Sequence, residues 1–145
     1  MFEMRKEKFF VDYGNGQGDW TEMDVLVRED GFKLMLIGGG REMQSQFRYT
    51  DKDLTFDFNA MRYDDHLRPT DTWEVTLGLA LRFLSERTGK PVSIEQMHEI
   101  ARNIDQALRA WPPRLLERDV PINKVRFDMT YWPQWDKKAG TYYER

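Results

Sequence analysis

Residues 20–37 have the sequence WTEMDVLVREDGFKLMLI, and their pattern is the clearest guide to the architecture of the chain. Up to Arg28 the apolar and polar side chains alternate, and apolar residues return from 32 to 37. Alternation with a period of two is typical of a strand that buries one face, because successive side chains point to opposite sides. Between the two runs, Asp30-Gly31 favours a tight two-residue hairpin, which needs positive φ values. The stretch therefore predicts two antiparallel strands.

The same alternation continues on both sides of this hairpin in the first sixty residues. Further strands are predicted at 7–13, 43–49 and 54–59, with a polar loop at 14–19 and a glycine turn at 38–40. Short connections favour antiparallel pairing of successive strands, because a parallel pair needs a long crossover. We therefore expect five strands that follow one another across a meander sheet.

After Pro69 the spacing of apolar residues changes to three and four, which is typical of an amphipathic helix. A first helix is expected at about 72–87, with Asp71 and Glu74 as a capping-box pair at its start and Gly89 at its end. One apolar stripe of this helix holds Trp73, Leu77, Leu81 and Leu84, and a neighbouring stripe holds Val75, Leu79 and Phe83. Because the stripes cover so much of the circumference, we expect this helix to be central and buried, with the sheet curled around it.

A second helix is predicted from Ser93, where Gln96 completes a capping box, to the Pro112-Pro113 pair. Its apolar stripe consists of Ile94, Met97, Ala101, Ile104, Leu108 and Trp111. The short connector before Ser93 makes the two helices an antiparallel hairpin. Residues 124–131 alternate again and predict a sixth strand, which returns to the sheet edge or pairs with another chain.

These patterns predict one α+β domain over residues 1–145, an antiparallel meander sheet of five to six strands packed on a two-helix hairpin. Residues 136–145 are expected to be a tail that could be mobile. A chain of 145 residues that is 40% hydrophobic and 14% aromatic can bury a sizeable core. The charged N-terminus lacks the apolar segment of a signal peptide, and cysteine is absent, so we expect a cytoplasmic protein.

Composition also narrows the partners of the chain. The net charge of −3 argues against a nucleic-acid binder, which normally carries a basic excess to release phosphate counterions. The longest apolar stretch, near 77–84, is far too short to span a membrane. The sequence therefore favours another protein as the partner, with a homodimer as one form of this.

Asp64-Asp65-His66 is the first candidate for chemistry, because two carboxylates and an imidazole could bind a divalent metal or transfer protons. Three consecutive residues do not converge easily on one ion, so a solvated loop is favoured. If a pocket forms at this sheet–helix junction, it would be lined by Arg62, Tyr63, Asp64, Asp65, His66 and Arg68.

Catalytic motifs elsewhere are incomplete. His98-Glu99 begins like a zinc-protease motif, but Arg102 stands where the second histidine is required. No serine lies in a nucleophile-elbow pattern, and there is no cysteine. The sequence therefore favours a protein that is not an enzyme, and it predicts neither a metal site nor a cofactor.

The C-terminal segment is rich in aromatic side chains. Trp132, Trp135, Tyr142 and Tyr143 are the predicted binding residues, because Tyr and Trp bury a large area at low entropic cost in interfaces. The alternative is that Trp132 and Trp135 cover one end of the core.

Three functional hypotheses follow. The first is a non-catalytic protein-binding module that uses an acidic surface and the C-terminal aromatic residues. It is of the inhibitor, immunity or adaptor kind, which this chain resembles in size and charge only. The second is a small-ligand binder or enzyme with its site around Asp64-Asp65-His66. The third is a structural homo-oligomer that pairs edge strands through residues 124–131.

Overall fold

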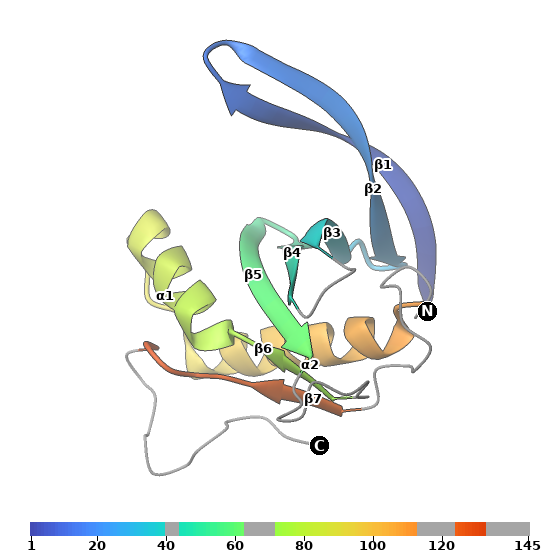
Figure 1. Ribbon diagram of the computed structural model, residues 1–145. Coiled ribbons are helices and arrows are strands. Elements are labelled where there is room, and N and C mark those ends of the chain that lie inside the picture. Colours follow the sequence, from blue (N-terminus) through green and yellow to red (C-terminus); the bar gives the residue numbers. More distant parts are fainter. Residues whose placement is uncertain (40–43, 63–71, 113–123, 133–145) are drawn as a thin grey trace.

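The computed structural model describes residues 1–39, 44–62, 72–112 and 124–132 (Figure 1). Within these ranges the strands are β1 (Phe2–Gly14), β2 (Gln17–Arg28), β3 (Lys33–Gly39), β4 (Gln44–Asp51), β5 (Leu54–Arg62), β6 (Thr72–Val75) and β7 (Lys124–Phe127). The helices are α1 (Leu77–Thr88) and α2 (Ile94–Ala110). The strands form one sheet in the order of the chain, antiparallel from β1 to β6. The predicted α+β meander on a helix pair is confirmed, with one strand more than expected.

The additional strand replaces the first turn of the expected first helix. Trp73 and Val75 are buried while Thr72 and Glu74 are half-buried, which is the two-residue period of a strand. The apolar spacing from Trp73 to Leu77 fits either structure, and pairing with β5 on one side and β7 on the other selects the strand. The expected capping box at Asp71 and Glu74 is therefore wrong, since Glu74 lies within β6 and Asp71 lies outside the described residues.

Helix α1 instead begins after Thr76, and its start is held by backbone groups of other segments. The Thr76 side chain makes no capping bond to the helix, because its hydroxyl donates to the Asn59 carbonyl at 2.8 Å. The Gly78 N–H, one of the helix's orphan first-turn donors, donates to the Asp128 carbonyl at 2.8 Å. The residues after β7 thus supply the cap.

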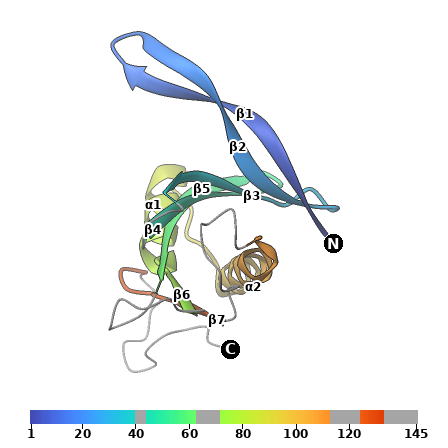
Figure 2. The ribbon, with the colours of Figure 1, turned by 45° about the vertical axis from the view of Figure 1, so that its right-hand side comes forward.

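The central helix is α2, not α1. Phe83 of α1 has an exposed fraction of 58%, so the expectation of a helix buried on two stripes is wrong. The sheet curls around α2, with β3, β4 and β5 on one side of it and β6 and β7 on another (Figure 2). The predicted capping box is confirmed, because Ser93 accepts from the Gln96 N–H and the Gln96 side chain accepts from the Ser93 N–H.

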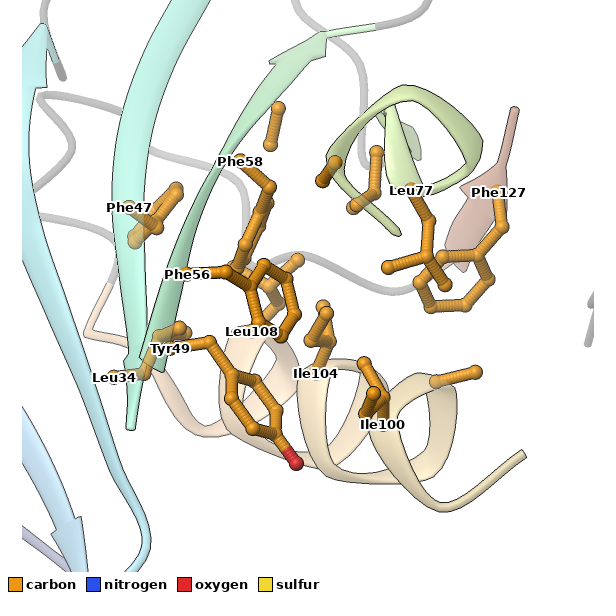
Figure 3. Close-up of a cluster of buried hydrophobic side chains, with 14 of the residues drawn as sticks. Leu34, Phe47, Tyr49, Phe56, Phe58, Leu77, Ile100, Ile104, Leu108 and Phe127 are labelled. Atoms are coloured by element: carbon orange, nitrogen blue, oxygen red, sulfur yellow. The ribbon is translucent and has the colours of Figure 1, made fainter. Parts of the chain in front are cut away.

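The core lies between the hollow of the sheet and the two helices. Aromatic side chains of the sheet reach toward α2, while Leu77 of α1 and Phe127 of β7 lie side by side (Figure 3). The ring centroids of Tyr49 and Phe56 are 4.8 Å apart. Each large apolar side chain buried in this way stabilises the fold by about 1.5–3 kcal/mol relative to exposure. The division of the chain into sheet and helices therefore rests on one shared interior.

Two turns differ from their expected form. Asn15 and Gly16 have φ values of 55° and 73°, and Gly14 pairs with Gln17, so they form the tight two-residue hairpin. At Asp30-Gly31 only Gly31 has a positive φ, 98°, and the Arg28 N–H donates to the Phe32 carbonyl across three residues. The larger loop accommodates an ordinary Asp30 backbone, so the expected two-residue hairpin is wrong there.

The ends of β3 and β7 also differ from the sequence prediction. Gly38 and Gly39 belong to β3 rather than to a turn, and Gly40 lies outside the described residues. The sixth predicted strand returns to the sheet edge as β7, which pairs in parallel with β6. It ends at Phe127, because the Asp128 carboxylate accepts from the Thr130 N–H and hydroxyl and bends the chain. Neither helix in the described part of the chain has the length and apolarity to cross a membrane.

Candidate functional site

The predicted site residues fall mostly outside the described ranges. Arg62 is the last residue of β5, whereas Tyr63, Asp64, Asp65, His66 and Arg68 are not described. Trp132 has an exposed fraction of 5% and belongs to the core cluster, so it presents little surface to a partner. Trp135, Tyr142 and Tyr143 also lie outside the described residues. Binding by these three residues stays a prediction.

The β1–β2 hairpin carries a different candidate site. Strand β2 pairs with β3 only from Val25 to Val27, whereas it pairs with β1 along its whole length. Residues 6–24, called the arm below, therefore form a two-stranded ribbon that leaves the body of the molecule (Figures 1 and 2). The arm is the part of the described chain that stands furthest from the core.

The sequence of the arm favours a hairpin both in its turn and in its cross-strand pairs. The Asn15-Gly16 turn has the positive φ values that match the twist of two antiparallel strands. Oppositely charged residues face each other along the ribbon, with the Lys6 ammonium 3.2 Å from the Asp24 carboxylate and Lys8 opposite Glu22. Cross-strand pairs of this kind stabilise a ribbon modestly and fix its register.

The base of the arm is fastened to the body at two places. The Lys33 ammonium of β3 lies 2.7 Å from the Glu7 carboxylate. The Arg48 guanidinium of β4 lies 4.7 Å from the centre of the Phe9 ring, a geometry in which cation and ring attract each other. These contacts orient the arm without covering its outer end.

The arm exposes three aromatic side chains. Phe10 and Trp20, called the tip patch below, have exposed fractions of 48% and 64%, and Tyr13, nearer to the turn, has one of 67%. Phe10 and Trp20 are directly opposite each other, with ring centroids 5.4 Å apart in an edge-on arrangement. The Phe10 ring also lies directly on Gly18, where a Cβ would overlap it. The pair is thus held in place on its own ribbon while much of its surface faces solvent.

The backbone of the arm adds a second kind of surface. Strand β1 is at the end of the sheet, and residues 17–24 of β2 have no strand beside them other than β1 among the described residues. Unpaired strand edges offer N–H and C=O groups to an added strand. The arm can therefore bind through the side chains of the tip patch and through backbone groups along its edges.

The sequence contained a signal for the arm that the strand prediction did not use. In a strand that buries one face, the other face is polar, yet 9–13 carry aromatic residues at Phe9 and Phe10, on opposite faces, and again at Tyr13. Together with the Asn15-Gly16 turn, this pattern indicates a long ribbon with apolar side chains on both faces. Comparison with protein-family models, curated proteins and solved structures finds no match to this chain.

Proposed function

We propose that the protein is a non-catalytic protein-binding module that holds its partner through the tip patch of the arm. The observation that supports this most is the Phe10–Trp20 pair, exposed on the ribbon next to the point where Phe9 makes the contact with Arg48 of the body. Aromatic side chains dominate the binding energy of protein interfaces, because they bury a large area and have few rotatable bonds. An inhibitor, immunity or adaptor role fits such a surface.

The exposure of the tip patch is hard to explain by folding alone. A two-stranded ribbon is marginally stable in water, and the tip patch takes no part in the core cluster. Phe10 and Trp20 contact each other, but most of the Trp20 surface faces solvent. A partner that covers the pair would remove this apolar area from water, which is favourable by about 25 cal/mol per Å².

The charges and the aromatic side chains of the arm also indicate what kind of surface the partner has. Residues 6–24 contain five carboxylates and two lysines, and only Asp24 and Glu22 face a lysine across the ribbon, so the arm is acidic and repels acidic surfaces. The partner we propose is therefore a protein with an apolar-walled cleft that receives Phe10 and Trp20 and has no acidic rim. An exposed strand of that protein could extend the ribbon by β-augmentation.

A capture experiment with matched variants tests this proposal. The immobilised wild-type protein, a Phe10→Ala/Trp20→Ala variant and a Phe83→Ala control are each exposed to an extract of the cells that make the protein. Phe83 is an exposed aromatic residue of α1 and is as solvent-accessible as the tip patch. We expect one protein to be retained by the wild type and by the control but lost by the arm variant.

The captured protein is then purified and titrated against each variant by calorimetry. Truncation of an interface hot spot costs about 2 kcal/mol or more, so we expect the Kd to rise by about 30-fold or more in the arm variant. Equal affinity of the arm variant and the wild type would refute the proposal.

Light scattering over a concentration series separates this function from self-association. We expect a monomer at all concentrations. If the protein forms a dimer and Trp20→Ala abolishes it, a second copy of the chain occupies the tip patch, and the proposal of a different protein as the partner is overturned. A dimer that survives Trp20→Ala but is lost when β7 (Lys124–Phe127) is altered would instead support a homo-oligomer paired through edge strands.

A further inference from the structure

A hollow of about 450 Å³ opens on the body at a distance from the tip patch in the chain and in the fold. It lies between the turn that joins β4 to β5, the C-terminal end of α1 and the first turns of α2. Its apolar wall is formed by Leu54, Leu84, Val92 and Ile100. A hollow of this size and lining is large enough for a small organic group or an amino-acid side chain.

The carboxylate of Asp51 is the unusual feature of this hollow. Asp51 has an exposed fraction of 8%, and its side chain lines the hollow. No hydrogen bond or ion pair to this carboxylate is present among the described residues. Its oxygens are not among the enclosed polar atoms that lack a partner, so the carboxylate is open to the hollow, and a cation that approaches from there can form a charge-assisted hydrogen bond with it.

The Arg28 guanidinium attracts the Asp51 carboxylate at a distance but makes its hydrogen bonds to other residues. The Arg28 guanidinium donates two hydrogen bonds to Asp30, at 2.7 and 2.8 Å, and a third to the Asn103 side-chain oxygen at 2.8 Å. The Asn103 amide in turn donates to the Tyr49 hydroxyl at 2.8 Å. Arg28 is therefore fixed by these partners, and Asp51 is left facing the hollow.

The electrostatics at the inner end of the hollow are negative. Burial raises the pKa of the Tyr49 hydroxyl, and the neighbouring carboxylates of Asp51 and Glu99 raise it further. Asp53 adds a third carboxylate at the wall, against the ammonium groups of Lys52 and Lys90. The two lysines are exposed, and so are Asp53 and Glu99, so solvent screens these four charges more than it screens Asp51.

We propose that this hollow binds a primary ammonium or guanidinium group carried on a short alkyl chain. The cation would pair with the Asp51 carboxylate, with Glu99 as a second acceptor, while the alkyl chain would pack on Leu54, Leu84 and Ile100. The same chemistry is presented by a free alkylamine and by a lysine or arginine side chain of a peptide. The site uses no residue of the arm, so it stands independently of the proposed protein-binding function.

Amide chemical shifts of the ¹⁵N-labelled protein test the proposal with simple probes. The probes are butylammonium and butylguanidinium, with butanol and butyrate as neutral and anionic controls of similar size, and Nα-acetyl-lysine methylamide as the peptide form. We expect the cations to cause saturable shifts at residues 51–54 and 96–100, and the controls to cause none. Tighter binding of the acetyl-lysine amide than of butylammonium would identify a peptide side chain as the source, and the reverse a free amine.

Variants separate a charge-specific site from an apolar hollow. Asp51→Asn is expected to weaken butylammonium binding at least tenfold and Glu99→Gln severalfold, whereas Glu95→Gln, an exposed residue of α2 outside the hollow, leaves it unchanged. Equal binding of butanol and butylammonium, or unchanged binding of butylammonium by Asp51→Asn, would overturn the proposal. If Asp51→Asn does not fold, the Glu99→Gln titration decides in the same way.

Discussion

Single residues of this protein hold segments together where the chain passes close to itself. Gly78, in the first turn of α1, is such a position, because a Cβ there would overlap the backbone carbonyls of Met129 and Thr130. The glycine allows the segment after β7 to come near enough for the Gly78 N–H to bond the Asp128 carbonyl. The absence of a side chain is thus what permits backbone capping of α1.

Substitution of this glycine should be costly. We expect Gly78→Ala to lower the free energy of unfolding by about 3 kcal/mol, at the upper end of overpacking costs, since the obstructing atoms are backbone and cannot rotate away. Gly38→Ala is the matched control, because its Cβ would meet only the Gln46 side chain at an ordinary distance of 3.8 Å. Urea unfolding of the two variants measures the difference, and equal midpoints would refute the close approach.

The pairing of Arg28 with Asp30 makes stability depend on pH at the residue scale. The side-chain hydrogen bonds from Arg28 lower the pKa of the Asp30 carboxyl to about 2, below its ordinary value of about 3.9. A group whose pKa falls on folding stabilises the protein fully above its unfolded pKa, and this contribution is lost as the pH drops toward the folded pKa. The loss therefore falls between about pH 4 and pH 2.

This dependence can be measured with Asp30→Asn. We expect the wild type to have a higher melting temperature than the variant at pH 6. This difference in melting temperature, called the gap, should narrow between pH 4 and pH 2, where the wild-type carboxyl takes up its proton. Melting curves at several pH values give the gap, and an NMR titration of Asp30 gives its pKa directly. A gap that is constant with pH, or an Asp30 that titrates near pH 4, would contradict the ion pair.

At the scale of elements, the strands and α2 were predictable because local and tertiary preferences agree. The capping box at Ser93 and the apolar stripe from Met97 to Leu108 are local signals, and the core buries that same stripe. Ile94 lies at the start of the stripe and is half exposed, so the buried stripe begins at Met97. Where local sequence preferences and packing favour the same structure, that structure can be predicted from the sequence alone.

Strand β6 could not be predicted because its identity depends on partners distant in the chain. Trp73 and Val75 are compatible with the apolar spacing of a helix, and only pairing with β5 and with β7, some fifty residues later, makes them a strand. The arm was not predicted, because residues 9–13 alternate like a half-buried strand although they carry aromatic side chains on both faces. The sequence does not show that the pairing of β2 with β3 stops at Val25.

Substitution of two tryptophans tests how much the arm and the sheet interior each contribute to the stability of the fold. We expect Trp73→Ala to lower the free energy of unfolding by about 3–5 kcal/mol, because Trp73 is buried and truncation leaves a cavity. Trp20→Ala should change it by only about 0.5 kcal/mol, as for most surface substitutions. Urea unfolding measures both. A loss of similar size for Trp20→Ala would mean that the tip patch serves the fold and not a partner.

The whole molecule combines a compactly packed body with a projecting ribbon. The sheet curls around α2, and residues from β2 through Trp132 share one core, so the body is a stable base for the arm. The contacts of Glu7 with Lys33 and of Phe9 with Arg48 fix the direction in which the ribbon leaves. The body therefore supplies stability and orients the ribbon, and the arm supplies an exposed aromatic surface.

Site-specific photocrosslinking in the cells that make the protein tests this division most directly. A photoreactive phenylalanine analogue replaces Trp20 in one variant and Phe83 in another, and the products of irradiation are separated by mass. We expect a discrete covalent adduct with one other protein from position 20 and none from position 83. Irradiation that yields no adduct at position 20, or the same adducts at both positions, would contradict a partner-binding role for the arm.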